Sequence, residues 1–393
     1  MKPEKLRSSE RENPMADQST INAALRVARR LTALVGAALL LAGCATQQVE
    51  QPAVKLVWPG PPLPTRIEFV RSLFGEKDMT SDDTFKADLT QFLTGKRGPE
   101  NRLTEPSGIA VSDDGQRVYV SDFVQLAVYK FDFGKKTFSK INKEKQLERP
   151  SGVALDAAEN VYVVESDKKG IQVFSPEGKE IRFITDPSIS RPTGIAIDRL
   201  RGRIYLSDTS HSKSPLHTVK IFDLQGKLTG DLGKGKGSDP GQFLFPTYVT
   251  LDPQGNVYVA DTLNSRVQKF DPDGKYLASY GERGNSWGMF DKPKGVAIDS
   301  FGNLYVVDSG WSNVQIFNQK KEILMFLGGR GDLPGMLRTP GPIAIDGKNR
   351  IYVGDFLNHR VEVYQLTNTS AADSFLNPLG KAAGAEQKAV VKK

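Results

Sequence analysis

The chain has 393 residues, with 53 basic and 46 acidic side chains, a formal net charge of +7 and 38% apolar residues. This composition is ordinary for a folded globular chain and excludes intrinsic disorder as its general state. One cysteine and three histidines exclude a disulfide framework, a multi-cysteine zinc site and an iron–sulfur cluster.

Residues 1–43 have the pattern of a secretory signal. Three arginines between residues 26 and 30 precede an uncharged run over residues 31–43, which is too short to cross a bilayer as a helix. A second methionine, Met15, offers an alternative start that gives a signal of ordinary length. The general secretory route is therefore expected.

The end of this run, Leu41-Ala42-Gly43-Cys44, resembles a bacterial lipobox. The resemblance implies cleavage before Cys44, acylation of its sulfur and anchoring in a membrane. Ala45 favours the outer membrane, with the protein facing the periplasm or the cell surface. The alternatives are a buried free cysteine and an ordinary signal peptide that is cut elsewhere.

The chain that follows residue 43 is nearly neutral. It retains 46 basic and 42 acidic residues, a net +4, so the marked basic excess of a nucleic-acid binder is absent. Residues 44–65 are rich in proline and predict an extended tether to the membrane. Residues 369–393 are rich in Ala and Lys, lack apolar periodicity and predict a flexible tail.

A strand and a helix are expected before the repeats begin. Residues 66–75 resemble the fourth strand of the later repeats and predict the strand that closes the last unit. Residues 81–96 place Phe85, Leu89 and Phe92 on one helical face after an N-cap at Ser81. They predict an amphipathic helix that packs on the main fold as a lid, with partner docking as the alternative.

Six segments over residues 102–368 share one layout. Each has a proline, an apolar residue three positions earlier, a tyrosine 12 or 13 positions later and an acid three positions beyond that. The prolines are Pro106, Pro150, Pro192, Pro246, Pro293 and Pro340. The apolar residues are Leu103, Leu147, Ile189, Phe243, Phe290 and Leu337. The tyrosines are Tyr119, Tyr162, Tyr205, Tyr258, Tyr305 and Tyr352, and the acids are Asp122, Glu165, Asp208, Asp261, Asp308 and Asp355.

Each segment reads as four short strands separated by turns. The runs are β-branched and aromatic, and glycines such as Gly226 and Gly274 stand where two-residue hairpins need a positive φ. One four-stranded sheet cannot cover both its faces, so the units are expected to stack around an axis. The sequence therefore predicts an all-β, monomeric, six-bladed β-propeller over residues 66–368.

The motif Pro-x-Gly-Ile-Ala-Ile-Asp, followed by Gly-Asn-x-Tyr-Val-x-Asp and by x-x-Asn-x-Arg-Val, resembles the NHL-repeat family. The fourth and sixth segments carry it best. Blade four departs from it with Tyr248 in place of Gly, and blade six with Pro342. Enzymes that share this repeat or this fold hold zinc or calcium at the axis, which the resemblance raises as an alternative here.

The residues themselves favour structure over metal chemistry. An acid at the same point of every blade is expected to accept backbone N–H groups of the adjoining turn, and the Arg five residues on is expected to pair with it in blades four and six. His211 and His217 belong to blade three and His359 to the opposite blade six, with no evident third ligand nearby. No cofactor is therefore expected, and a divalent cation remains the alternative.

The long loops after blades three, four and five present cationic and aromatic side chains, which are typical of interfaces. With His359 they form the candidate partner-binding set, namely Lys234, Lys236, Arg283, Trp287, Trp311, Arg330 and His359. The alternative is that these loops are solvated and fold onto their blades. The favoured interpretation is a non-enzymatic, membrane-tethered binding or scaffold protein with a protein or glycan partner in the envelope. The alternative is a divalent-metal-dependent propeller enzyme of the lactonase or lyase kind.

Overall fold

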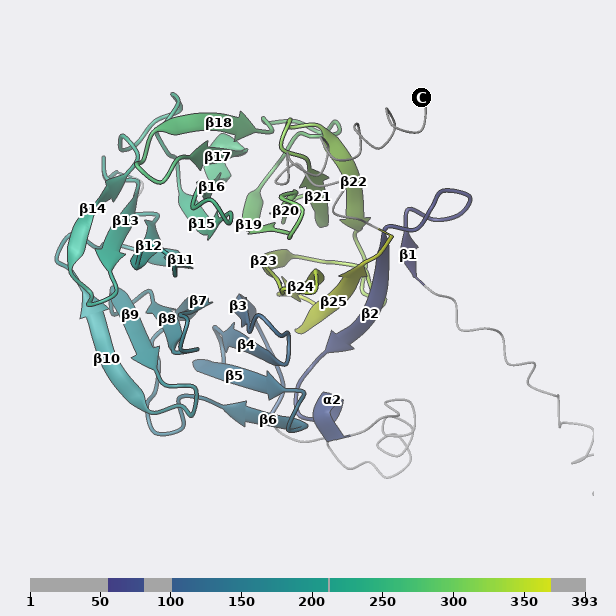
Figure 1. The fold of residues 1–393 in the computed structure, drawn as a ribbon, viewed down its shortest axis with the longest axis horizontal. Coiled ribbons are helices and arrows are strands. Elements are labelled where there is room, and N and C mark those ends of the chain that lie inside the picture. Colours follow the sequence, from purple (N-terminus) through teal and green to yellow (C-terminus); the bar gives the residue numbers. More distant parts are fainter. Residues whose placement is uncertain (1–55, 81–100, 211–212, 369–393) are drawn as a thin grey trace, which may run out of the picture. The chain divides into compact units, whose positions relative to one another are not determined.

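The computed structural model describes residues 56–80, 101–210 and 213–368. These residues form a six-bladed β-propeller in which six antiparallel sheets stand around a central axis (Figure 1). The predicted fold class is confirmed. The signal, Cys44, most of the tether, the predicted helix over 81–96 and the tail lie outside the described residues.

Each blade begins with its innermost strand and moves outward. Blades one to three are made of β3 (Pro106–Val111), β4 (Arg117–Asp122), β5 (Ala127–Asp132) and β6 (Thr137–Lys140); β7 (Pro150–Leu155), β8 (Val161–Glu165), β9 (Gly170–Phe174) and β10 (Glu180–Thr185); and β11 (Pro192–Asp198), β12 (Arg203–Asp208), β13 (Thr218–Asp223) and β14 (Leu228–Leu232). Blades four and five are made of β15 (Pro246–Leu251), β16 (Val257–Asp261), β17 (Arg266–Phe270) and β18 (Tyr276–Tyr280), with a 3₁₀ turn η1 (Thr262–Asn264); and of β19 (Pro293–Ile298), β20 (Leu304–Asp308), β21 (Asn313–Phe317) and β22 (Ile323–Gly328).

The sixth blade joins the two ends of the described chain. It contains β23 (Pro340–Ile345), β24 (Arg350–Asp355) and β25 (Arg360–Leu366), and its fourth strand is β2 (Ile67–Leu73), which pairs antiparallel with β25. The closing strand predicted from residues 66–75 is therefore present. A short extra strand, β1 (Val57–Trp58), pairs with β2, so this part of the expected tether belongs to the sheet instead.

Little helix accompanies the strands. A single turn, α2 (Lys77–Thr80), follows β2, and Asp78 holds its start by accepting the Phe74 and Gly75 amides. Across the three described stretches, no helix has the length and apolar character that a bilayer crossing requires.

The apolar core is divided into six clusters, each between two neighbouring blades. Two columns of the repeat meet in every cluster. The tyrosine of one blade, for example Tyr258 at 0% exposure, lies in the same cluster as the apolar residue that precedes the next proline, here Phe290 at 0%. A large aromatic ring and its apolar partner therefore form the main hydrophobic contact between neighbouring blades.

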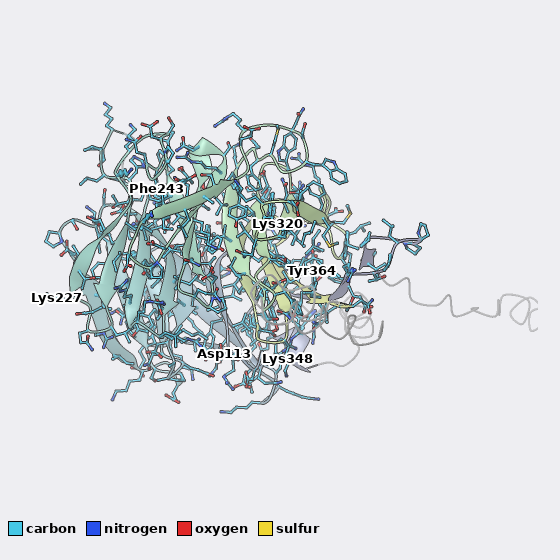
Figure 2. The ribbon with its side chains drawn as sticks, turned by 45° about the horizontal axis from the view of Figure 1, so that its top comes forward. Asp113, Lys227, Phe243, Lys320, Lys348 and Tyr364 are labelled. Carbon is cyan, nitrogen blue, oxygen red and sulfur yellow. The ribbon has the colours of Figure 1, made fainter. Side chains whose placement is uncertain are left out.

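The propeller has two unlike faces. One, the hairpin face, carries the two tight hairpins of each blade, where Gly226 and Gly274 adopt φ of 93° and 86°. Near the axis this face is bound together, because the Gly347 amide donates to the Asp113 carbonyl at 3.2 Å, between the hairpins that Asp113 and Lys348 mark in Figure 2. The Arg199 guanidinium also contacts Asp113, at 2.7 Å, and thereby links blade three to blade one.

The opposite face, which we name the connection face, carries the links from each outer strand to the next inner strand. Every inner strand begins there with a β-bulge just after its proline, as between Pro293 and Val296 in blade five. A bulge re-aims the side chains beside it and is frequent next to functional sites. The residue directly after each proline therefore has a special place at the axial end of this face.

Candidate functional site

The six acids of the repeat build the connection face. Their side chains are at most 1% exposed. Each accepts one or two backbone N–H groups from the two residues before its own blade's proline, as Asp308 does from Asp291 at 2.8 Å and Lys292 at 3.1 Å. These bonds hold the incoming link against the second strand.

The arginine expected beside two of these acids is present in only one case. In blade four, the Arg266 Nε donates to Asp261 at 2.9 Å. In blade six, Arg360 instead pairs with the buried Glu362 at 2.7 Å, so the expected Arg360–Asp355 pair is wrong. Arg360 and Glu362 lie two residues apart on β25, whereas Asp355 ends β24. The Glu362 carboxylate is buried, and a buried carboxylate favours a charged partner.

The histidines do not converge. The His217 Nδ1, in blade three, accepts a hydrogen bond from the Phe245 amide of blade four at 3.1 Å. The two rings also make a T-shaped contact. The His359 Nδ1 contacts the Thr104 carbonyl between blades six and one. His211 lies outside the described residues. Both described rings therefore have local hydrogen-bonding roles.

A divalent cation does not fit the described residues. Nowhere in residues 56–80, 101–210 and 213–368 do three His, Cys, Asp or Glu side chains gather as a metal would require. The acids of the repeat, moreover, direct their oxygens to backbone amides. We therefore derive no chemical step through a metal.

The candidate partner-binding residues lie on the connection face but are largely tied to backbone. Three of them occupy equivalent positions, namely Lys236, Arg283 and Arg330. Each forms an isolated β-bridge with the apolar residue of its own loop. Arg283 donates to the Leu263 carbonyl at 2.8 Å and Arg330 to the Gly310 carbonyl at 3.0 Å.

The remaining members of that set differ in exposure. The Trp311 indole donates to the Gly284 carbonyl at 3.2 Å, whereas Trp287 is 77% exposed and makes a T-shaped contact with the Phe326 ring. Lys234 stands in the equivalent link between blades three and four, with its backbone N–H on the Gly241 carbonyl. The set therefore gives each link its local shape rather than converging on one point.

A ring of side chains surrounds the axis where the inner strands begin. We name it the inner ring, and it contains the residue after each proline: Ser107, Ser151, Thr193, Thr247, Lys294 and Gly341. Hydroxyls join neighbouring blades around most of this ring. Ser107 donates to the Pro150 carbonyl at 2.8 Å, and Ser151 donates to the Thr193 carbonyl at 2.9 Å.

The same pattern continues through blades three and four. Thr193 donates to the Thr247 carbonyl at 2.8 Å. The Thr247 hydroxyl meets that of Thr262 at 2.6 Å, and Thr262 donates to the Pro293 carbonyl at 2.7 Å. Four successive junctions are therefore closed by hydroxyl groups.

The inner ring is interrupted at blades five and six, where Lys294 and Gly341 replace the hydroxyls. Lys294 is partly buried, and its ammonium has no hydrogen-bond or ion-pair partner among the described residues. Burial and, secondly, the neighbouring Lys292 ammonium lower the pKa of the Lys294 amine from its ordinary value. An unpaired amine is thus placed at one of the two points where the ring offers no hydroxyl.

Ser309 stands beside this interruption. Ser309 directly follows the acid of its blade, as Ser166 and Thr262 do in blades two and four. In those blades the hydroxyl of this residue lies 3.2 Å from the hydroxyl of Ser151 and 2.6 Å from that of Thr247, both in the inner ring. The Ser309 amide donates to the Lys292 carbonyl at 3.0 Å, which fixes its backbone. Its hydroxyl is partly exposed and, within the described part of the chain, has no hydrogen-bond partner. We name Lys294, Ser309 and Gly341 the axial site.

Tyr248 ties opposite blades together at the same level. Its hydroxyl donates to the Ser107 carbonyl at 2.8 Å, so the side chain reaches from blade four to blade one. Burial raises the pKa of the Tyr248 phenol well above its ordinary value, so it stays protonated and acts as a donor. A Cβ on Gly341 would stand 3.8 Å from this hydroxyl, which places Tyr248 next to the axial site.

A separate groove of about 460 Å³ opens on the hairpin side of blades three and four. Its charged walls are largely paired, because Arg201 contacts Asp198 at 3.0 Å and Asp231 contacts Lys220 at 2.9 Å. Unpaired amine and hydroxyl groups distinguish the axial site from this groove, and the axial site is therefore the candidate functional site.

Comparison with known proteins supports the same architecture. A family model described as SMP-30/Gluconolactonase/LRE-like region matches residues 77–210, and an NHL repeat model matches residues 243–270. Residues 77–210 of this β-propeller are thus similar to the first model and residues 243–270 to the second. The peptidyl-glycine alpha-amidating monooxygenase A of Xenopus laevis is 35% identical over 127 residues, 30% of this chain and 12% of the relative. The chain spans about an eighth of the length of the curated relatives it matches.

Solved structures show the same fold. The chain is similar to a gluconolactonase of Xanthomonas campestris, with a TM-score of 0.51, 17% identity and coverage of 76% of this chain and 98% of that one. It is also similar to a streptogramin B lyase, with a TM-score of 0.50, 14% identity and coverage of 67% and 94%.

The favoured interpretation from the sequence, a non-enzymatic binding or scaffold protein, is wrong. The match to the gluconolactonase-like model over residues 77–210, in a propeller that resembles lactonase and lyase structures, supports the enzyme alternative better. Lys294 and Ser309 belong to no known catalytic motif, and the one signal at this position in the sequence is a lysine in a column otherwise held by Ser, Thr and Gly.

Proposed function

We propose that this propeller is an enzyme of the lactonase kind that works at the axial site on the connection face. The observation that carries the proposal is Lys294, an amine with a lowered pKa and no partner among the described residues, at the interruption of the inner ring. Perturbed titratable groups of this kind concentrate at catalytic sites. The match to a gluconolactonase-like model supports the class of reaction.

The chemistry needs one proton carrier. The neutral Lys294 amine takes a proton from a water molecule as the water oxygen attacks the lactone carbonyl carbon. The ring C–O bond then breaks, and the ammonium returns the proton to the leaving alkoxide oxygen. Lactone and water thereby give the open-chain hydroxy acid. The Ser309 hydroxyl donates a hydrogen bond to the carbonyl oxygen as negative charge develops on it.

The other groups at the axis position this pair. Tyr248 holds blade four to blade one beside Gly341, and the hydroxyls of the inner ring hold the first five blades in register. Gly341 contributes no side chain at this point of the inner ring. A rigid scaffold of this kind reduces the cost of orienting the reacting groups.

The test measures hydrolysis of D-glucono-1,4-lactone by the full chain, above the uncatalysed rate. Lys294→Met is expected to lower kcat/KM by about 100-fold or more, since a general base contributes that much. Lys227→Met, on the outer rim of blade three (Figure 2), is the matched control and is expected to behave as the unmodified protein. Equal rates for Lys294→Met and the unmodified protein would refute the role of Lys294.

We also propose that the enzyme is a bacterial lipoprotein held in the cell envelope through Cys44. The sequence around Cys44 and the neutral charge of the following chain support this. Two or more acyl chains give a stable anchor, whereas one alone binds a membrane only marginally. Incorporation of an alkyne-labelled fatty acid into the protein, absent in Cys44→Ser, is the expected result; equal labelling of both would contradict it.

A further inference from the structure

The rim above the inner ring carries more positive than negative charge. We name as the rim the residue directly before each proline: Glu105, Arg149, Arg191, Phe245, Lys292 and Thr339. These residues share one backbone position, because each carbonyl accepts the amide of the residue that follows its blade's acid. The rim therefore holds three cations and one carboxylate around the axis.

Two of these cations are uncompensated. Arg149 contacts Asp167 at 3.4 Å and lies over the Phe123 ring at 5.0 Å. The Arg191 and Lys292 side chains are exposed, and no residue within the described ranges accepts a hydrogen bond from them or forms an ion pair with them. Both have long, flexible stems, so their charged ends are free to adapt to a ligand.

The nearest acid of the repeat forms no ion pair with these cations among the described residues. The Asp308 carboxylate accepts four backbone amides, those of Asp291, Lys292, Gly310 and Trp311, at 2.8–3.2 Å. Among charged groups, only the Lys292 ammonium acts on Lys294, and it repels. Arg191, Lys292 and Lys294 therefore have no ion-pair partner among the described residues, and a bound anion would supply one.

From this charge balance we propose that the axial site takes an anionic substrate, a sugar lactone that carries a second, carboxylate group. Lys292 and Arg191 bind that carboxylate, while Lys294 and Ser309 face the lactone carbonyl. The lactone part of this proposal rests on the proposed function, whereas the carboxylate part rests on the rim cations alone.

The experiment measures binding of D-glucuronate to the full chain by isothermal titration calorimetry at low ionic strength, where exposed charges are least screened. Methyl β-D-glucoside, an uncharged ring of similar size, is the matched ligand. D-Glucuronate is expected to bind at least tenfold more tightly than the glucoside. The double variant Lys292→Met/Arg191→Met is expected to lose about tenfold in affinity for D-glucuronate, as removal of two exposed charged contacts predicts.

The control is Lys227→Met/Lys275→Met, which removes two exposed lysines from turns on the hairpin face and is expected to change D-glucuronate affinity less than twofold. An equal loss in both double variants would show that net charge alone attracts the anion, and would overturn the proposal. So would equal affinity of the unmodified protein for the two ligands.

The two proposals fail separately. If D-glucuronate binds through Lys292 and Arg191 and no lactone is hydrolysed, the anion site is supported and the lactonase function is refuted. If D-glucono-1,4-lactone is hydrolysed and D-glucuronate binds no better than the glucoside, the lactonase function is supported and the anion site is refuted.

Discussion

Removal of the Asp261 carboxylate tests the structural role of the acids in the repeat. Asp261 accepts four hydrogen bonds, from the Leu244 amide at 2.6 Å, the Asn264 amide group at 2.8 Å, the Arg266 Nε at 2.9 Å and the Gln268 amide group at 3.1 Å. The Asp261→Ala variant leaves all four donors without this acceptor.

The expected loss of stability follows from burial and pairing. The Arg266 side chain is 14% exposed and that of Asp261 0%, and breaking such a buried pair from one side costs about 3–5 kcal/mol. Two facts favour a loss of stability at the lower end of this range. Arg266 keeps its bonds to the Asp239 and Gln242 carbonyls, and burial already raises the pKa of Asp261, which shows that the charged carboxylate is costly to hold there.

We therefore predict a loss of about 3 kcal/mol for Asp261→Ala, which corresponds to a fall in Tm of about 5 °C for a domain of this size. Urea unfolding followed by circular dichroism measures it. Asp273→Ala, at an exposed turn of the same blade, is the control and is expected to change stability by less than about 0.5 kcal/mol. A loss for Asp261→Ala no larger than that of the control would refute the reasoning.

Three further predictions concern the axis. Tyr248→Phe removes the hydrogen bond from the phenol hydroxyl to the Ser107 carbonyl and should cost about 1–3 kcal/mol in urea unfolding; an unchanged stability would contradict the cross-axis tie. The Lys294 amine should titrate at a lower pH than exposed lysines in NMR of the ¹³C-dimethylated protein. Between its folded-state and unfolded-state pKa values the unfolded chain binds more protons, so the contribution of Lys294 to stability should rise with pH through that window. An ordinary lysine pKa would contradict the site. Arg199→Met breaks the partly exposed pair with Asp113 and should cost less than about 1 kcal/mol, so a loss above about 2 kcal/mol would be inconsistent with a solvent-screened contact.

The sequence predicted the propeller because each blade repeats the residues that seal it. Tyr258 and Phe290 belong to different repeats, yet both recur at fixed spacing, and the structure places them in one cluster. The closing strand was also predictable, since residues 66–75 match the missing fourth strand of blade six. The short strand β1 was not, because two residues next to prolines carry too little pattern to indicate pairing.

The axial site was beyond the reach of the sequence for a different reason. Tyr248 and Ser107 are 141 positions apart, and only closure of the ring brings them together. Lys294 stands at a position where blades one to four have hydroxyls, and the sequence shows this difference, but only the structure shows that the column forms one ring around the axis. Repeat motifs report what every blade shares, whereas the axial site arises where two blades differ.

The most direct test of the account is the dependence of kcat/KM for D-glucono-1,4-lactone on pH, in the unmodified protein and in Lys294→Met. We predict that the unmodified enzyme gains activity through an ionisation at the same pH as the Lys294 amine titration, and that this limb is absent from the variant, in which activity is low throughout. Profiles of the same height and shape in both proteins would contradict the assignment of the axial site.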